Sequence, residues 1–422
     1  MRRTPTPRTA GRLAACAVLL VAAAPAACAA AQQGSGANDR NMLSEARIDS
    51  LPPAQRQAWR EYIARSRRLA ALDSAEMRRE LAATGQAAMK AAPNQNGSTV
   101  VGEHPAAWYR SPEAKRIADA ILTYQTPSGG WSKRVDLAAG PRRAGTNFTS
   151  ESHWSYVATI DNGATTGQMQ TLAGEYAATH DAHYAASFLR GLEYLFEAQQ
   201  PTGCWPQVYP LQGGYHDAGT FNDDAMVHVL RLLQDVSRGR YDFVPDSLRQ
   251  EAATRVKQGT QCILNSQVRV NDTLTVWCAQ NDPLTLVPVK ARSYEFPSLS
   301  GGESVGVMEF LMDLPDPGPR VVRAVRAAAD WFRKSAIYGY DYTYKGKLVP
   351  KEGAGPIWAR FYEIGTNRPI FSGRNGIIRY RMDEIEPERR YGYAWYRTDA
   401  VGALKRYDAW SRAHPGAQAG RP

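Results

Sequence analysis

The sequence predicts a mainly α-helical protein, an α/α toroid of repeated helical hairpins joined by long functional loops. Apolar residues recur at helical spacing in several segments, for example at Ile117, Ile121 and Leu122, whereas alternating strand patterns are few and short. Tryptophans at positions 131, 205, 277 and 358 are separated by 74, 72 and 81 residues. A period of about 75 residues fits one helical hairpin with its loop, and repetition of such a unit builds a toroid.

The N-terminal thirty residues have the features of a secretory signal peptide. A basic stretch ends at Arg12, an apolar run covers residues 13–24, and small residues surround Cys28. The apolar run is shorter than the roughly 20 residues that a membrane-spanning helix needs. We therefore assign residues 1–30 to a signal peptide and expect a secreted or periplasmic protein. Lipoprotein anchoring at Cys28 remains the alternative.

Residues 31–104 are expected to form a linker and a helical N-terminal extension. The first of these residues are small and polar, which is typical of a linker. Residues 43–92 have a helical composition dense in Arg, Ala and Glu, which Pro52-Pro53 interrupts. We expect the basic face of this extension to be solvated. Residues 105–415 would then form the toroid domain, which carries the repeats and the candidate site.

The composition fits a globular chain of 422 residues with a large core, since 43% of the residues are hydrophobic and 22% are charged. These values exclude a wholly disordered, collagen-like or disulfide-knot protein. The formal net charge is +10, and it falls to +6 without the four arginines of the signal peptide. This mildly basic balance suits a polyanionic partner without identifying one.

Export would leave three cysteines, Cys204, Cys262 and Cys278, so the mature chain would contain at most one intramolecular disulfide. No pair of them has the C-x-x-C spacing of a zinc cluster. We interpret the three as small buried hydrophobic residues, while a bridge between Cys262 and Cys278 remains open.

Two polar loops place carboxylates beside amides, one over residues 159–166 and the other over residues 220–224. Asp161 and Asn162 lie in the first loop, and Asp223 lies in the second. Long loops within a compact domain are usually functional, and hard oxygen donors from two loops suit Ca²⁺. Asp and Asn are also favoured helix N-caps, and each motif precedes an apolar helical pattern, so capping remains the alternative.

Four cationic residues lie in loops that are rich in Gly and Pro: Lys290, Arg292, Arg360 and Arg374. Such positions lack the i,i+4 partners that usually explain charged residues on a helix surface. Arginine suits planar, bidentate binding of carboxylates, so these residues are candidates for contacts with an acidic substrate. Alternatively, each guanidinium pairs with a nearby Glu and holds its loop.

Common catalytic motifs are absent from the sequence, which contains no G-x-S-x-G, no G-x-x-x-x-G-K-[ST] and no H-E-x-x-H. The seven histidines show no metal-ligand spacing. Two of the loop carboxylates could serve a glycoside hydrolase, so that class stays open.

Several stretches together resemble the family 10 pectate lyases, which are secreted bacterial enzymes. These stretches are GGWSK at 129–133, TIDNGATT at 159–166, CWPQVYP at 204–210, FNDDAM at 221–226, ARSYEFPS at 291–298, RFYE at 360–363 and SGR at 372–374. The resemblance does not extend to the N-terminal extension.

The resemblance implies an α/α toroid that cleaves polygalacturonate, an acidic plant cell-wall polysaccharide, by calcium-assisted β-elimination to 4,5-unsaturated oligogalacturonides. Carried onto this chain, Asp161, Asn162 and Asp223 would hold the Ca²⁺. Arg292 would be the Brønsted base, and the nearby calcium and cationic neighbours would lower its pKa.

The same resemblance implies that Thr166, Arg360 and Arg374 engage the uronate hydroxyls and carboxylates, and we add Lys290 as a nearby binding residue. We expect a monomer with neither a nucleic acid partner nor a membrane span. Two alternatives remain open: a toroid glycoside hydrolase that acts on a uronate polysaccharide, and a non-catalytic polyuronate-binding protein.

Overall fold

The computed structural model describes residues 41–95, 100–150, 158–343 and 347–415. These residues all belong to the second of two compact units, which covers residues 39–422. The predicted signal peptide, the start of the linker and Cys28 lie outside the described residues.

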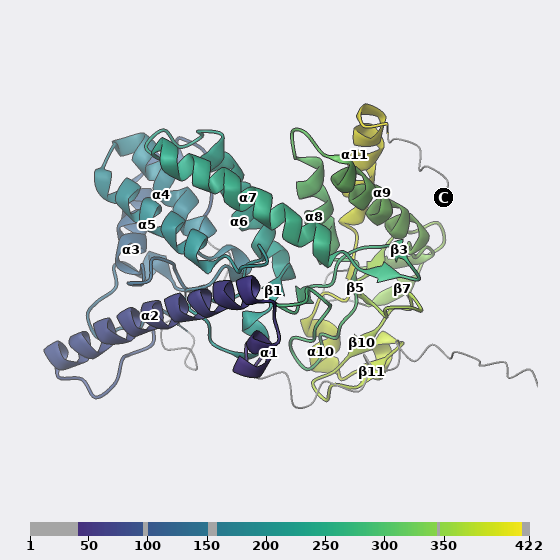
Figure 1. The fold of residues 1–422 in the computed structure, drawn as a ribbon, viewed down its shortest axis with the longest axis horizontal. Coiled ribbons are helices and arrows are strands. Elements are labelled where there is room, and N and C mark those ends of the chain that lie inside the picture. Colours follow the sequence, from purple (N-terminus) through teal and green to yellow (C-terminus); the bar gives the residue numbers. More distant parts are fainter. Residues whose placement is uncertain (1–40, 96–99, 151–157, 344–346, 416–422) are drawn as a thin grey trace, which may run out of the picture. The chain divides into compact units, whose positions relative to one another are not determined.

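Eleven α-helices dominate the described part of the chain, so the predicted mainly helical class is confirmed (Figure 1). In chain order they are α1 (Glu45–Asp49), α2 (Pro53–Thr84), α3 (Pro112–Thr123), α4 (Thr166–Thr179), α5 (Ala182–Ala198), α6 (Ala225–Ser237), α7 (Asp246–Ser266), α8 (Glu303–Met312), α9 (Pro319–Lys334), α10 (Pro387–Gly392) and α11 (Ala400–Ala413).

Three helical hairpins follow one another along the chain: α4 with α5, α6 with α7, and α8 with α9. Helix α4 also packs on α6, and α6 packs on α8, so that the first helices of successive hairpins are neighbours. Helix α11 packs on both helices of the third hairpin (Figure 1). Each helix buries an apolar stripe, such as Met226, Val229 and Leu233 of α6, because residues three and four apart share a helix face.

The repeated tryptophans tie the end of one helix to the loop that follows it. All four indoles are buried, and each indole N–H donates to a backbone carbonyl of the preceding helix, at Ile121, Leu195, Ile263 and Phe332. The glutamines that precede three of them act similarly. The Gln125 side-chain amide, for example, donates to Gly129 O and to Ser187 O in α5. The repeat is therefore structural, and its tryptophans do not stack on a ligand.

The same repeat also positions the loops that carry the candidate site. The backbone carbonyl of each of the first three tryptophans accepts an N–H from the segment that precedes the next hairpin, namely from Thr159, Thr220 and Ser300. The distances are 3.0, 3.0 and 2.8 Å. Asp161 follows its anchor by two residues, and Asp223 and Glu303 follow theirs by three, so each repeat presents a carboxylate shortly after its anchor.

The strands are short, and all pair in antiparallel two-stranded sheets within the described residues. They are β1 (Gly219–Thr220), β2 (Arg269–Val270), β3 (Thr273–Leu274), β4 (Gln280–Asn281), β5 (Leu299–Ser300), β6 (Tyr340–Tyr342), β7 (Leu348–Pro350), β8 (Trp358–Ala359), β9 (Phe361–Tyr362), β10 (Phe371–Ser372), β11 (Ile378–Arg379) and β12 (Tyr396–Arg397). Three pairs, β1–β4, β5–β9 and β8–β12, join loops that are distant in sequence and so hold the site loops together.

The N-terminal helix α2 packs against the hairpins through a few buried residues. Trp59 and Tyr62 join the core, and the Tyr62 hydroxyl donates to Ala198 O at 3.0 Å. The Asp73 carboxylate accepts two hydrogen bonds from Ser128, one from its N–H and one from its hydroxyl, both at 2.8 Å. The arginines Arg60 and Arg79 of the same helix are solvent-exposed.

One disulfide joins Cys204, in the loop after α5, to Cys262 in α7. All three cysteines are buried, as expected, and they form the single disulfide that their number allows. The bridge between Cys262 and Cys278 that remained open is not formed. Cys278 is free and buried. The pairing joins the first and second hairpins, an arrangement that cysteine spacing alone does not reveal.

Candidate active site

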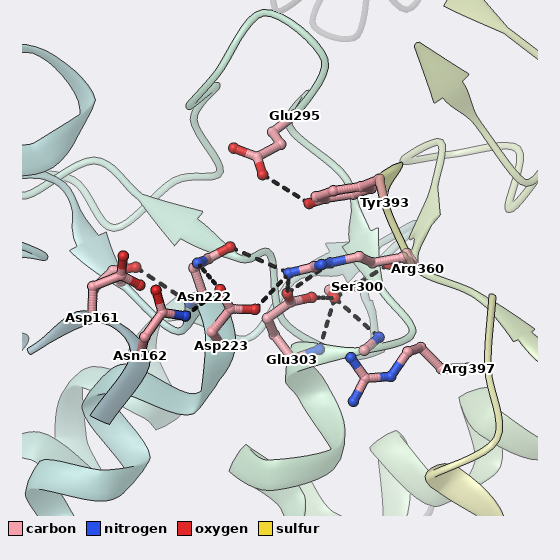
Figure 2. Close-up of polar contacts among 12 residues, drawn as sticks. Asp161, Asn162, Asn222, Asp223, Glu295, Ser300, Glu303, Arg360, Tyr393 and Arg397 are labelled. Atoms are coloured by element: carbon pink, nitrogen blue, oxygen red, sulfur yellow. Dashed lines mark hydrogen bonds and ion pairs between the residues drawn. The ribbon is translucent and has the colours of Figure 1, made fainter. Parts of the chain in front are cut away.

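A polar pocket of about 420 Å³ lies where the loops that follow the repeat tryptophans meet the C-terminal loops. It is lined among others by Lys133, Asp161, Asn162, Asn222, Asp223, Tyr215, Arg292, Arg360, Tyr393 and Arg397. Five of the eight sequence-predicted site residues thus share one pocket. In Figure 2 the acidic and amide side chains form a row from Asp161 and Asn162 to Arg360, with Arg397 at its far end.

The two acidic loops have the same backbone form. Each begins at a threonine that is anchored to a tryptophan carbonyl and contains a short 3₁₀ turn, over Asp161–Gly163 and Asn222–Asp224. The second turn residues, Asn162 and Asp223, correspond to each other and both have left-handed backbones, with φ of 53° and 50°. Asn and Asp tolerate this conformation better than other non-glycine residues, and strained backbones cluster at functional sites.

The carboxylates of these loops do not cap the helices that follow. Asp161 Oδ2 accepts from Lys133 Nζ at 2.6 Å, and Asp161 Oδ1 is buried with no hydrogen-bond donor among the described residues. Asp223 Oδ2 accepts from the side-chain amides of Asn222 at 2.9 Å and Asn162 at 3.3 Å (Figure 2). The capping alternative is therefore wrong for both residues, because their carboxylates turn into the pocket.

Arg360 is a buried cation between two carboxylates. Its side chain is 5% exposed; Nε donates to Glu303 Oε1 at 2.9 Å, and Nη2 donates to Asp223 Oδ1 at 3.0 Å. Burial alone lowers the pKa of Arg360, but the charges of Glu303 and Asp223 raise it well above its ordinary value. Burial likewise would raise the pKa of Asp223, but Arg360 holds it below the ordinary value. Both groups are therefore charged at neutral pH.

Arg292 lies across the pocket and is paired with a second glutamate. Its Nε donates to Glu295 Oε2 at 2.8 Å, and the Tyr393 hydroxyl donates to the other oxygen of the same carboxylate at 2.8 Å. Burial lowers the pKa of Arg292, but the hydrogen bonds and charge of Glu295 outweigh burial and raise it above the ordinary value. The protein groups around Arg292 therefore do not lower its pKa, because a carboxylate rather than a cation is the nearest partner.

Three predicted residues lie outside the lining of this pocket. Thr166 begins α4, and its hydroxyl donates to Gly163 O at 3.3 Å on the side of a neighbouring pocket. The Lys290 ammonium lies 4.8 Å from the centre of the Phe296 ring. The Arg374 side chain is 63% exposed and pairs with Glu388. For Thr166 and Lys290 the sequence context could not show this, since each lies within a few residues of a residue that does line the pocket.

Several residues of the site, in the pocket lining or directly behind it, escaped the sequence analysis. Glu303 has the sequence context of a capping box, and its N–H does donate to Ser300 Oγ at 3.0 Å, yet its carboxylate binds Arg360. Lys133 belongs to the GGWSK stretch, which was a usable signal. No sequence signal pointed to Tyr393 and Arg397, because they lie in an aromatic segment without a recognisable motif.

The donor set suits a hard cation. Two carboxylates, Asp161 and Asp223, and the neighbouring amides supply oxygen ligands of the kind that Ca²⁺ prefers. The buried, unpartnered Oδ1 of Asp161 is the observation that favours a ligand here, because such an atom is costly to leave without a partner. No group of three or more His, Cys, Asp or Glu side chains with metal-binding geometry occurs among the described residues, so amide, backbone or water oxygens would have to complete the shell.

Comparisons with known proteins agree with this geometry. The model of the family described as pectic acid lyase matches residues 125–403. A family 10 polysaccharide lyase from Cellvibrio cellulosa is 36% identical, with a TM-score of 0.65, and the match covers 74% of this chain and 99% of that chain. An aspartate-to-alanine variant of such an enzyme from the same organism, in complex with trigalacturonic acid, matches with the same identity and TM-score over 72% of this chain and 97% of that chain. No curated protein matches the sequence.

Proposed function

Because the chain belongs to the pectic acid lyases, polysaccharide lyase family 10, we propose that it cleaves polygalacturonate by calcium-dependent β-elimination. The observation that carries this proposal is the single pocket in which Asp161 and Asp223 face Arg292 and Arg360. The complex of the Cellvibrio enzyme with trigalacturonic acid supports an oligogalacturonate as the ligand.

The reaction requires a site that stabilises negative charge. The C5 proton of a uronate is weakly acidic, since its removal adds charge next to a carboxylate. The electron pair of the C5–H bond forms the C4–C5 double bond, the C4–O glycosidic bond breaks, and the leaving oxygen takes up a proton. Fixed positive charge around the substrate carboxylate lowers the activation barrier for removal of the C5 proton. The effect is stronger where water is excluded.

Two groups of residues would supply this positive charge, one by holding Ca²⁺ and the other by holding the calcium ligands in place. Asp161 and Asp223, with Asn162 between them, would hold Ca²⁺, which when bound supplies positive charge at the substrate carboxylate. Arg360 remains positive between Glu303 and Asp223, and it holds the Asp223 carboxylate in place. Its own burial leaves little of the guanidinium for direct substrate contact.

Arg292 is the residue that we place at the reacting carbon. Its side chain is 40% exposed and lines the pocket, while Glu295 and Tyr393 hold it from behind. As a proton acceptor it would need to shed a proton that Glu295 currently stabilises. A substrate that draws Arg292 away from Glu295, together with bound cations nearby, would favour that loss.

We extend the proposal to location and architecture. The signal-like residues 1–30 support export to the periplasm or the medium, where the polysaccharide is met. The series of hairpins α4–α5, α6–α7 and α8–α9 supports closure as an α/α toroid. No helix among the described residues has the length and apolarity to cross a membrane.

The test is an assay on polygalacturonate with and without a chelator. We expect ultraviolet absorbance from the unsaturated product in the presence of Ca²⁺ and its loss after chelation. Reducing ends without that absorbance would instead indicate hydrolysis. Full activity in excess chelator would remove Ca²⁺ from the proposal.

A further inference from the structure

A second pocket of about 430 Å³ adjoins the candidate active site. The two pockets share three lining residues, Lys133, Arg134 and Asn162. Asn162 stands beside Asp161 at the end of the polar row that is remote from Arg397 (Figure 2). The second pocket therefore continues the first one at this end.

One wall of the second pocket comes from the N-terminal extension, through Asn94, Gln95 and residues 100–101. This wall is held by backbone hydrogen bonds to the loop after Trp131. Gln95 N–H donates to Arg134 O at 3.0 Å, and Asp136 N–H donates to Pro93 O at 2.9 Å. The wall lies before the residues that the family model matches, 125–403, and the two Cellvibrio structures are covered almost completely by only 72–74% of this chain.

The charge of this pocket favours an anionic ligand. Two cations, Lys133 and Arg134, and no carboxylate line it among the described residues. Lys133 already binds Asp161, whereas no described carboxylate pairs with the Arg134 guanidinium. Arg134 also has a left-handed backbone, with φ of 59°, and strain of this kind at a non-glycine residue is typical of functional sites.

A buried polar side chain with an unpartnered oxygen lines the same pocket. The Gln168 side chain, on α4, is only 5% exposed and lines the pocket, yet its Oε1 has no hydrogen-bond donor among the described residues. A buried acceptor without a donor is destabilising unless a ligand supplies the donor. A sugar hydroxyl is a donor of the required kind.

We propose that this pocket is a distal subsite for a further uronate residue of the polysaccharide, built in part by the N-terminal extension. The Arg134 guanidinium binds the uronate carboxylate, and Gln168 Oε1 accepts from a ring hydroxyl. The proposal rests on the proposed function, since the substrate must run from the active-site pocket into this one. Its consequence is a preference for longer oligogalacturonides.

The experiment measures binding of trigalacturonate and hexagalacturonate by calorimetry in an Arg292→Ala background, where turnover is blocked. Two further substitutions are compared in this background, Gln168→Leu and Arg134→Gln. Gln168 lines only the second pocket. Each should weaken hexagalacturonate binding about three- to tenfold, the usual factor for one lost polar contact, and trigalacturonate binding less than twofold. Arg78→Gln, on the exposed face of α2, is the control for loss of one positive charge.

Gln168→Leu removes an unpartnered buried atom, so we expect its melting temperature to equal or exceed that of the parent. Equal losses for the two oligomers, or unchanged hexagalacturonate binding, would overturn the subsite. A different result would contradict the proposed function, namely that the wild-type protein forms no unsaturated product from any oligogalacturonate. Length-dependent binding that Gln168→Leu reduces would uphold the subsite even in that case.

Discussion

Arg292 and Arg360 are held in different ways, although each pairs with a glutamate. Arg360 is enclosed between Glu303 and Asp223 and has little free surface. Arg292 binds Glu295 on one side and leaves the other side open to the pocket. The first is therefore suited to organise the site, and the second is suited to meet the substrate.

Replacement of Arg292 tests this division. Arg292→Ala and Arg292→Lys should both lower kcat by two or more orders of magnitude, within the range of roughly 10²–10⁴ that is typical of acid–base groups. Lys keeps the charge but loses the planar fork that fits Glu295. KM should change little, since the acidic loops that would hold Ca²⁺ at the substrate carboxylate remain. Steady-state kinetics on polygalacturonate provide the measurement, and Arg381→Ala, an exposed arginine outside the pocket, is the control.

The opposite pattern would contradict this assignment. A raised KM with preserved kcat means that Arg292 binds the ground state and the transition state equally. The proton acceptor would then have to be another residue of the same pocket.

Asp161 and Asp223 are predicted to be essential for activity and for a thermal response to Ca²⁺. The melting temperature of the wild-type protein should rise with Ca²⁺, because a ligand that binds only the folded state stabilises it. Asp161→Ala and Asp223→Ala should abolish both turnover and this rise.

Asp181→Ala is the matched control, since Asp181 is a true N-cap that accepts His183 N–H at 2.9 Å. We expect that control to lose a little stability with its helix cap and to retain activity. A calcium-dependent rise that persists in both pocket variants would exclude these residues as ligands.

At the scale of elements, helix α2 shows how the extension is attached. Its burial is confined to a few side chains, among them Trp59, Tyr62 and Asp73, while most of its surface is solvated. Asp73 is the critical one, because a carboxylate is buried there without a cation. Burial raises its pKa from 3.8 to about 6, in spite of the two hydrogen bonds from Ser128.

The pH dependence of stability follows from that shift. The protonated carboxyl contributes stability that is fully present below the unfolded pKa of 3.8 and is lost as the pH rises through about 6. Asp73→Asn keeps a neutral group of the same shape, so it should raise the free energy of unfolding by about 1–3 kcal/mol at pH 8 and by much less at pH 4. Denaturant unfolding at both values is the measurement. Glu61→Gln, on the exposed face of α2, should show no such difference, and an equal effect of Asp73→Asn at both pH values would contradict the argument.

At the scale of the whole molecule, the Cys204–Cys262 disulfide links the first hairpin to the second across 58 residues. Neither cysteine lines the active-site pocket. Replacing both by Ala should lower the free energy of unfolding by about 2–5 kcal/mol, since the cross-link restricts the unfolded chain. Activity at low temperature should be retained. A reducing agent should destabilise the wild-type protein and leave the double variant unchanged; equal stability of the two proteins would show that the bridge does not contribute.

The sequence by itself determined the helical class, the tryptophan repeat and the two acidic loops. It also identified Arg292 and Arg360. These features are local, because helical periodicity, turn residues and loop composition are each visible within one segment. The repeat carried more information than expected, since its tryptophans also anchor the segments that present Asp161, Asp223 and Glu303.

Only the tertiary structure decided which of these residues meet. Arg360 and Asp223 are 137 residues apart in the chain and 3.0 Å apart in the pocket. Their contact depends on how the hairpins and the C-terminal loops pack. The same packing leaves Thr166, Lys290 and Arg374 outside the pocket lining, pairs Cys204 with Cys262, and brings the N-terminal extension to the rim of the site. Side-chain partners across such separations follow from the assembled core, and no local pattern in the sequence encodes them.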